Sequence, residues 1–262
     1  MNPLLDLGAR PVIAHRGASG LAPENTMPAF QLAAEQGADA FELDVQLTAD
    51  GAPVVLHDDT LDRTTDRAGP VGRLTLADLR SADAGARFTP DGGPSFPFRG
   101  TGARVPTLGE VLWAFPRMPL LVEIKHPSAQ EAVRRVLTQE DAVGRCVVAA
   151  ADPAALALFR EPPFACTASG PEISQLYWAA MLRRRPPRPR YRVLSVPERH
   201  RGLLVPTRRF ITVARELGCP VHVWTVNDPA AARRHWGRGL AGIVTNYPGA
   251  VRNARDSRVL SP

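Results

Sequence analysis

Short runs of apolar and β-branched residues recur along the chain, and most of them precede an amphipathic helical stretch. Strands that alternate with helices at this spacing are typical of α/β folds with a parallel sheet. The pattern predicts nine strands, at residues 12–16, 40–46, 53–57, 120–125, 146–150, 164–168, 193–196, 221–226 and 242–245. The helices that it predicts most clearly lie at residues 26–36, 107–115, 128–139, 208–217 and 229–236.

The second and third predicted strands are separated only by the stretch LTADGA, whose Asp-Gly dipeptide is a strong signal for a tight turn. A parallel crossover needs a dozen or more residues, so we expect these two strands to form a hairpin. If Thr48 pairs with Pro53 in this hairpin, His57 lies opposite Asp44. The eight other strands predict a TIM (β/α)8 barrel. A doubly wound sheet is the alternative, but no glycine-rich phosphate loop follows any predicted strand.

Two segments interrupt the alternation: residues 58–106, which include a Gly/Pro-rich stretch, and residues 183–192, which are rich in Arg and Pro. We interpret both as excursions over the mouth or rim of the barrel. No internal repeat is evident. We therefore predict one TIM-barrel domain over residues 1–262, in which residues 58–106 form a small insertion after the hairpin that follows the second barrel strand.

The composition is that of a folded globular protein, since 44% of the 262 residues are apolar and 22% are charged. These values exclude disordered and collagen-like chains. The chain shows neither a signal peptide nor an apolar run of roughly 18 residues, and we expect a soluble, cytoplasmic protein. The three cysteines form no CxxC pair, so each is expected to be a buried, small apolar residue: Cys146, Cys166 and Cys219.

The net charge of +6 arises from one segment, because residues 183–209 contain ten arginines and one acid, Glu198. We expect a solvated loop in this segment, with weak contact to an anionic membrane surface as the alternative. Tyr191 is the one aromatic residue interleaved among these arginines, so we do not expect nucleic-acid binding.

Lysine is nearly absent, since 31 of the 32 basic residues are arginine and only Lys125 is lysine. Arginine is planar and forked, whereas lysine carries a compact ammonium. We therefore expect Lys125 to lie where a guanidinium does not fit.

Titratable residues lie near the carboxyl ends of several predicted strands, where a core strand should be apolar and where TIM barrels form their active sites. Alternation with period two places Glu42 and Asp44 on one face, about 7 Å apart. It also places Glu123 and Lys125 on one face. The remaining strand-end groups are His15 and Arg16 in the first strand and His57 in the return strand.

These residues predict a metal-dependent site for phosphodiester hydrolysis. Three carboxylates in one barrel mouth repel each other unless a cation neutralises them. Oxygen ligands favour Mg²⁺ or Ca²⁺. His57, if it lies opposite Asp44, faces the same ion, and two imidazoles suit acid and base catalysis. Arg16 and Lys125 would bind an anion, which favours phosphoryl transfer.

Several motifs occur in one order across nearly the whole chain, and with them it resembles the glycerophosphodiester phosphodiesterase family. They are AHRGASGLAPENTMPAF at 14–30, FELDVQLTADGAPVVLHDDTLDRTTD at 41–66, VPTLGEVL at 105–112, VEIKHP at 122–127, VHVWTVND at 221–228 and GIVTNYP at 242–248.

The resemblance implies a TIM barrel that hydrolyses glycerophosphodiesters, which are small-molecule substrates, to sn-glycerol 3-phosphate and an alcohol. It implies that the ligands of one Mg²⁺ or Ca²⁺ are Glu42, Asp44 and Glu123. It further implies an acid/base pair, His15 and His57, phosphate-binding Arg16 and Lys125, and a pocket residue, Trp224. Two routes stay open, namely attack by a neighbouring substrate hydroxyl through a cyclic phosphate and direct attack by water.

Two other functions stay open. One is a lysophospholipase D-like enzyme that acts on lipid phosphodiesters and touches a membrane through its Arg-rich segment. The other is a non-catalytic barrel that binds phosphodiesters, against which the intact catalytic positions argue. Asn25 is either an N-cap or part of the site, and Glu24 either supports the site or is an exposed loop acid. We expect structural roles for the other histidines: His126, His200, His222 and His235.

Overall fold

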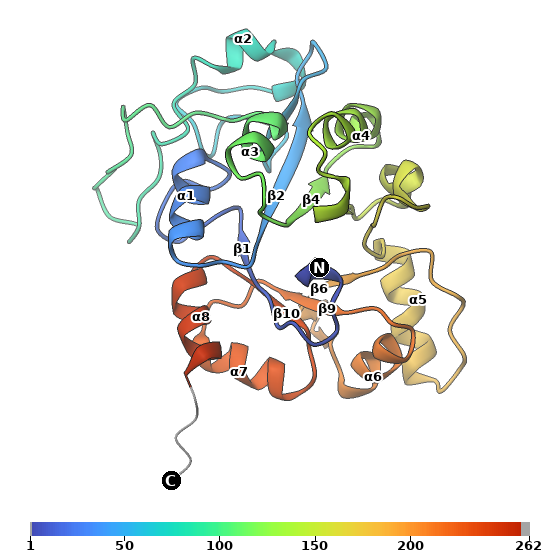
Figure 1. Cartoon of the computed structure of the whole chain (residues 1–262). Helices are drawn as coiled ribbons and strands as arrows, with labels where there is room; N and C mark the ends of the chain where they lie inside the picture. The colour runs from blue at the N-terminus through green and yellow to red at the C-terminus, as the bar shows by residue number, and fades with distance from the viewer. Residues whose placement is uncertain (1, 258–262) are drawn as a thin grey trace.

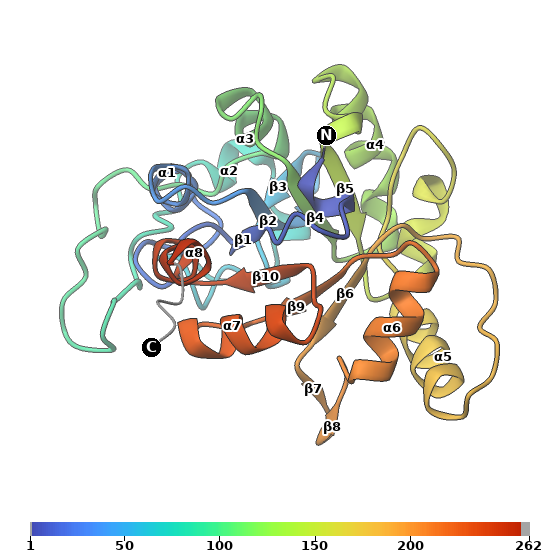
Figure 2. The same cartoon turned by 60° about the horizontal axis from the view of Figure 1, so that its bottom comes forward.

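Parallel strands form a barrel with helices on its outside (Figure 1). The computed structural model describes residues 2–257. Around the barrel, neighbouring strands are β5 (Cys146–Ala149), β4 (Leu120–Ile124), β2 (Ala40–Leu47), β1 (Val12–His15), β10 (Gly242–Thr245), β9 (Val221–Trp224) and β6 (Leu194–Pro197). The strand β3 (Pro53–Val55) pairs antiparallel with β2. A separate hairpin, β7 (Arg199–His200) with β8 (Leu203–Leu204), projects away from the barrel (Figure 2).

The predicted strand at 164–168 closes the ring, although it forms two isolated bridges rather than a continuous ladder. Cys166 bridges Val148 of β5, and Thr167 bridges Val193 beside β6, both in parallel orientation. Backbone N–H groups of Thr167 and Ala168 donate to Val148 and Val193. The predicted TIM barrel is therefore confirmed.

The five predicted helices are present, with ends that differ from the prediction by at most two residues. The helices are α1 (Met27–Glu35), α2 (Leu76–Leu79), α3 (Leu108–Ala114), α4 (Gln130–Gln139), α5 (Gly170–Met181), α6 (Arg208–Glu216), α7 (Pro229–Gly237) and α8 (Pro248–Asp256). The sequence did not predict α2, α5 and α8. Within residues 2–257, no helix combines the length and the apolar character that crossing a membrane requires.

Apolar residues fill the amino-terminal end of the barrel and leave its carboxyl end to polar groups. Leu4, which lies in a short turn of 3-10 helix, is fully buried and packs in one cluster with the strand residues Ile13, Ala40 and Leu121. Two residues further along β2 and β4, the same inward faces carry Glu42 and Glu123. A second cluster lies between strands and helices, and the three cysteines are buried as predicted.

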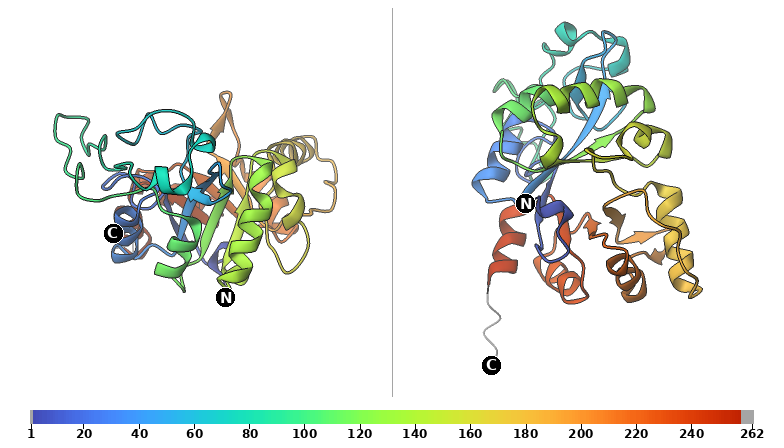
Figure 3. Two further views of the ribbon diagram at one scale, coloured as in Figure 1. Left: turned by 90° about the horizontal axis from the view of Figure 1, so that it is seen from above. Right: turned by 45° about the vertical axis from the view of Figure 1, so that its right-hand side comes forward.

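Residues 58–106 leave the barrel after β3 and return at Thr107, which bridges Val54 (Figure 3). They contain α2 and pack around a small apolar cluster of their own that includes Leu61, Val71 and Leu79. The assignment of one domain to residues 1–262 stays a prediction, and its ends, residue 1 and residues 258–262, lie outside the described residues.

The Arg-rich stretch 183–192 connects the end of α5 to the start of β6, so it runs towards the amino end of a strand and not over the mouth. Its residues 186–191 lie against Glu172, Gln175 and Leu176 of α5. The stretch therefore lies along α5.

The predicted hairpin forms, but its predicted register is wrong by one residue. Leu47 pairs with Pro53, and the N–H of Thr48 donates to the carbonyl of Ala52. The loop is therefore three residues long, with Gly51 at φ +76°, a geometry typical of three-residue hairpin loops. As a result Leu56, and not His57, lies opposite Asp44, and the N–H of Leu56 donates to the Asp44 carbonyl at 3.0 Å.

The turn after β1 requires glycine at position 17. Gly17 has φ +80°, and a Cβ there would lie 2.6 Å from the backbone of Ala29. We predict that Gly17→Ala destabilises the fold by about 2–4 kcal/mol, because left-handed strain adds to overpacking. Gly51→Ala is the matched control, since Gly51 also has positive φ but no atom lies within 4 Å of its Cβ position. Urea unfolding should show a larger loss for Gly17→Ala, and equal losses would contradict the steric argument.

Candidate active site

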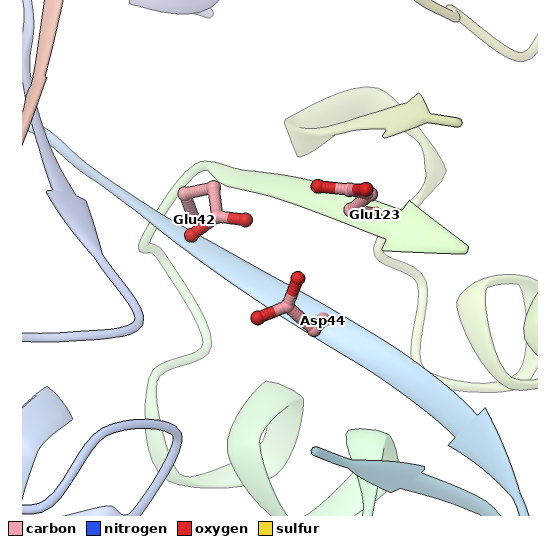
Figure 4. A group of neighbouring side chains, drawn as sticks. All are labelled: Glu42, Asp44 and Glu123. Carbon is pink, nitrogen blue, oxygen red and sulfur yellow. The ribbon is translucent and has the colours of Figure 1, made fainter. Parts of the chain in front are cut away.

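Three carboxylates meet where β2 and β4 run side by side, Glu42 and Asp44 from the middle of β2 and Glu123 from near the end of β4 (Figure 4). The parallel register places Glu123 beside Asp44, and Glu42 beside His15 of β1. Period-two alternation brings Glu42 and Asp44 to the same side of β2. One oxygen from each of the three carboxylates lies within 4.8 Å of the others.

The positively charged side chains of Arg16 and Lys125 form ion pairs with this acidic cluster. The Arg16 Nε lies 3.0 Å from Asp44 Oδ2, and the Lys125 Nζ lies 2.6 Å from Asp44 Oδ1 and 2.9 Å from Glu123 Oε1. Arg16 adopts φ +57°, and its backbone N–H donates to Glu42 Oε2 at 3.1 Å. Burial alone would raise the pKa of Asp44, but Lys125 and Arg16 hold that pKa below its ordinary value.

The donor set fits one hard divalent cation. Three carboxylates against one guanidinium and one ammonium leave an excess negative charge. Burial, together with Asp44 and Glu123, raises the pKa of Glu42 well above its ordinary value. The buried Oδ1 of Asn25 has no hydrogen-bond partner among the described residues. Ligand oxygens around one Ca²⁺ ion lie up to about 4.8 Å apart, and one oxygen from each of the three carboxylates lies within 4.8 Å of the others.

His15 lies beside this cluster in a defined tautomer. Its Nδ1 lies 2.7 Å from Asn246 Oδ1, which also accepts a hydrogen bond from Ser19. Because an amide oxygen only accepts, Nδ1 carries the proton and Nε2 keeps its lone pair. This Nε2 lies 3.9 Å from Glu42 Oε2. Burial and the positive charge of Arg16 lower the pKa of His15, which favours the neutral form.

No hydrogen bond or ion pair joins His57 to the three carboxylates in the described part of the chain, and a chain of charged groups links it to Arg16 instead. Its Nδ1 lies 2.6 Å from Asp58 Oδ1, so the proton on Nδ1 points at a carboxylate. Arg63 donates to Asp58 at 2.6 Å and also binds Glu24 at 2.7 Å. Glu24 in turn accepts from Arg16 at 2.9 Å.

Several contacts of the site come from loops that sequence reasoning left undecided or did not single out. Asn25 is not an N-cap, because Thr26 holds that position, and its Nδ2 donates to Asp44 at 2.9 Å from a buried position. Glu24 accepts hydrogen bonds from both Arg16 and Arg63, so it is more than an exposed loop acid. The motif stretches PENT, HDDTLDRTTD and TNYP carried the signal for these residues, but their partners lie far away in sequence.

A cavity of about 440 Å³ adjoins the acidic cluster, and Glu123 and Trp224 are among the residues that line it. Trp224 ends β9 and is half exposed. Its side chain therefore lines a pocket next to the cluster. His200, for which the sequence suggested a structural role, also lines this cavity.

A family model described as the glycerophosphoryl diester phosphodiesterase family matches residues 15–250. The chain belongs to this family. The matched range includes His15, His57 and the three carboxylates of the acidic cluster. The match confirms the resemblance seen in the motifs. As a member of the glycerophosphodiester phosphodiesterase family, the protein is a hydrolase of phosphoric diesters.

Curated relatives and solved structures agree with this assignment. The chain is 38% identical to the Bacillus subtilis protein YhdW over 90% of this chain and 94% of the relative. It is 31% identical to a Bacillus subtilis glycerophosphodiester phosphodiesterase over 90% and 83% of the two chains. The glycerophosphoryl diester phosphodiesterase domain of a Mycobacterium tuberculosis protein superposes with a TM-score of 0.85 at 25% identity. The superposition covers 94% of this chain and 99% of that domain. An Oleispira antarctica phosphodiesterase, solved with the product sn-glycerol-3-phosphate, superposes with a TM-score of 0.74 at 28% identity. The superposition covers 94% of this chain and 97% of that structure.

The link between Arg63 and Asp58 predicts a pH-dependent stabilisation of this family member. The hydrogen bond from Arg63 holds the pKa of Asp58 at about 2, below the ordinary value of 3.8. A depressed carboxyl pKa stabilises the fold above about pH 4, and the contribution is lost as the pH falls towards 2. We predict that Arg63→Gln lowers the unfolding free energy at pH 7 by about 1 kcal/mol or less, because the pair is partly exposed.

Urea unfolding between pH 2 and pH 7 measures this difference, which should vanish at the acidic end. Arg67→Gln is the matched control, since Arg67 lies in the same segment and is exposed. A difference between Arg63→Gln and wild type that stays constant down to pH 2 would show that Asp58 is not the partner responsible.

Proposed function

We propose that this chain hydrolyses glycerophosphodiesters to sn-glycerol 3-phosphate and an alcohol with one bound Mg²⁺ or Ca²⁺, and that His15 and His57 are its acid/base pair. The convergence of Glu42, Asp44 and Glu123 beside His15 is the observation that carries this proposal. The Oleispira antarctica neighbour, solved with sn-glycerol-3-phosphate, supports the same product.

Charge complementarity supports a divalent cation and a phosphodiester as joint occupants. The cluster with Arg16 and Lys125 carries one net negative charge when all three acids are ionised. A divalent cation held by Glu42, Asp44 and Glu123 would turn this into one net positive charge. A phosphodiester carries one negative charge and would neutralise it. When bound, the ion supplies Lewis-acid stabilisation of charge on the phosphoryl oxygens.

Arg16 and Lys125 orient the phosphate in this proposal. Both lie at strand ends, and both already bind Asp44, so their positions are fixed before substrate arrives. Fixed cationic donors stabilise charge on phosphoryl oxygens at little reorganisation cost. Trp224 limits the space beside Glu123 and contacts the substituent of the diester.

The two histidines divide the proton transfers. His15 accepts the proton of the nucleophile at Nε2, because Asn246 holds its other nitrogen as a donor. His57 donates a proton from Nε2 to the leaving alcohol oxygen, because its Nδ1 is engaged by the Asp58 carboxylate. The nucleophile is either a neighbouring substrate hydroxyl, with a cyclic phosphate as intermediate, or water.

We predict that EDTA abolishes the release of glycerol 3-phosphate from glycerophosphoethanolamine, and that Mg²⁺ or Ca²⁺ restores it. The same ion should stabilise the fold by about 2.7 kcal/mol at a concentration of 100 Kd, since it binds the folded chain only. Asp44→Asn should remove both effects. Glu131→Gln is the control, because Glu131 is an exposed helix acid. An EDTA-resistant activity of undiminished rate would contradict the proposed metal requirement.

We predict that His15→Ala and His57→Ala each lower kcat by about 10²–10⁴-fold, the range for loss of one proton-transfer group. Steady-state kinetics with glycerophosphoethanolamine and saturating metal ion measures this loss. His126→Ala is the control, because His126 is exposed and its partner is the surface residue Asp59. A His57→Ala variant with the kcat of wild type would remove His57 from the proposed acid/base pair.

Three statements from the sequence stay predictions: a cytoplasmic location, no binding of nucleic acid, and, as the alternative to a solvated loop, weak contact of residues 183–209 with anionic membranes.

A further inference from the structure

The cavity beside Glu123 is mostly apolar, unlike the charged cluster that it adjoins. Its volume is about 440 Å³, and it lies between the carboxyl ends of β5, β6 and β9, the helix α5 and the β7–β8 hairpin. The larger side chains that line it are Ile173, Tyr177, Trp178, Leu203, Val205 and Trp224. Besides Tyr177, the titratable side chains that line it are Glu123 and His200.

We propose that this cavity binds an alkyl or acyl chain carried by the phosphodiester substrate. The inference rests on the proposed phosphodiesterase function and names a substrate class for it, namely phosphodiesters with one apolar substituent. The proposal covers attachment of the hydrocarbon on either side of the phosphorus, to the glycerol or to the leaving alcohol, since the shared chemistry is the hydrocarbon itself.

Continuity with the acidic cluster places one substituent of a bound diester in the cavity. Glu123 belongs to both sites, because it is part of the carboxylate cluster and lines the cavity. Lys125, which holds the phosphate in the proposed function, lies 2.9 Å from the same carboxylate. A diester bound at Lys125 therefore extends one of its two substituents past Glu123 and into the cavity.

The lining favours hydrocarbon over a polar head group. Polar groups of Thr167, Tyr177, Ser195 and His200 also line the cavity, but most of its lining surface is apolar, and the Ser174 hydroxyl already donates to the Gly170 carbonyl. Aromatic rings also attract quaternary ammonium groups. However, about 440 Å³ lies in the range of pockets for drug-sized ligands and exceeds the needs of a choline or ethanolamine group.

Exposed apolar side chains around the cavity support the same occupant. Trp178, Leu203 and Trp224 line it and have 54%, 51% and 42% of their surface exposed, which places them among the most exposed large apolar residues of the described chain. Contiguous exposed apolar surface of this kind marks ligand-binding grooves. A bound hydrocarbon chain would cover these three side chains.

The reaction balances for either attachment of the chain. The P–O bond to the leaving alcohol breaks, oxygen from water ends on phosphorus, and a proton ends on the alcohol oxygen. A chain on the leaving alcohol gives glycerol 3-phosphate and an alkanol. A chain on the glycerol gives lysophosphatidate and a free head-group alcohol.

The first test measures binding and needs no turnover. Isothermal titration with n-alkylphosphocholines of increasing chain length, each below its micelle concentration, should give a Kd that falls about two- to fourfold per methylene group. The double variant Trp178→Ser, Leu203→Ser should flatten this dependence. Trp113→Ser is the matched control, since Trp113 is 79% exposed on α3 and does not line the cavity.

A wild-type Kd that does not change with chain length would overturn the inference. An affinity that follows the choline group, with choline phosphate bound as tightly as its long-chain esters, would do the same and would identify an ammonium site. Because binding is measured directly, a failure of the proposed hydrolysis does not decide this result.

The second test compares kcat/KM for two substrate series of matched chain length, lysophosphatidylcholines and glycerol 3-phospho-n-alkanols. We expect kcat/KM to rise with chain length in at least one series, and the products identify which side of the phosphorus carries the chain. In the double variant, the ratio of kcat/KM between the longest and the shortest chain should fall at least fivefold. Hydrolysis of short diesters with no rise in either series would leave the proposed function standing and overturn this inference.

Discussion

The burial of Asp44 is the constraint on which the mouth of the barrel depends. Its side chain is almost fully buried, and an isolated carboxylate at such a position costs several kcal/mol unless it is paired. Its partners Arg16, Asn25 and Lys125 come from the end of β1, the entrance to α1 and the end of β4. A shift of β2 by one residue would turn this carboxylate away from all three partners. The register of the barrel and the geometry of the site therefore depend on each other.

The part of the site that lies on strands could be predicted from the sequence. Alternation fixes which residues of β2 and β4 point inward, and parallel strands align their carboxyl ends, so Glu42, Asp44 and Glu123 meet without knowledge of any loop. In the hairpin, an error of one residue in the loop length was enough to misplace a side chain. The sequence indicated the turn correctly, but a loop of three residues instead of four moved His57 out of register with Asp44.

The residues that orient the strand-borne groups could not be predicted in the same way. Asn246 reaches His15 across 231 positions of sequence, and Arg63 reaches Glu24 across 39. No periodicity relates such positions, because loops place them. The apolar cavity was missed for another reason. Residues such as Ile173 and Leu203 carry the same hydrophobic signal as core residues, and the sequence analysis did not place α5, which carries several of them.

The single lysine explains how the charged and apolar halves of the mouth coexist. Lys125 contacts Asp44 at 2.6 Å and Glu123 at 2.9 Å, so one small ammonium joins carboxylates from two neighbouring strands. A guanidinium would bring a planar fork and a bulkier group to the same position, in a chain that otherwise uses arginine throughout. Glu123 is the boundary, since one oxygen faces Lys125 while the residue also lines the apolar cavity. A compact cation at this boundary offsets part of the negative charge of Asp44 and Glu123 and leaves the space towards Trp224 free, which is where the proposed substrate substituent would pass.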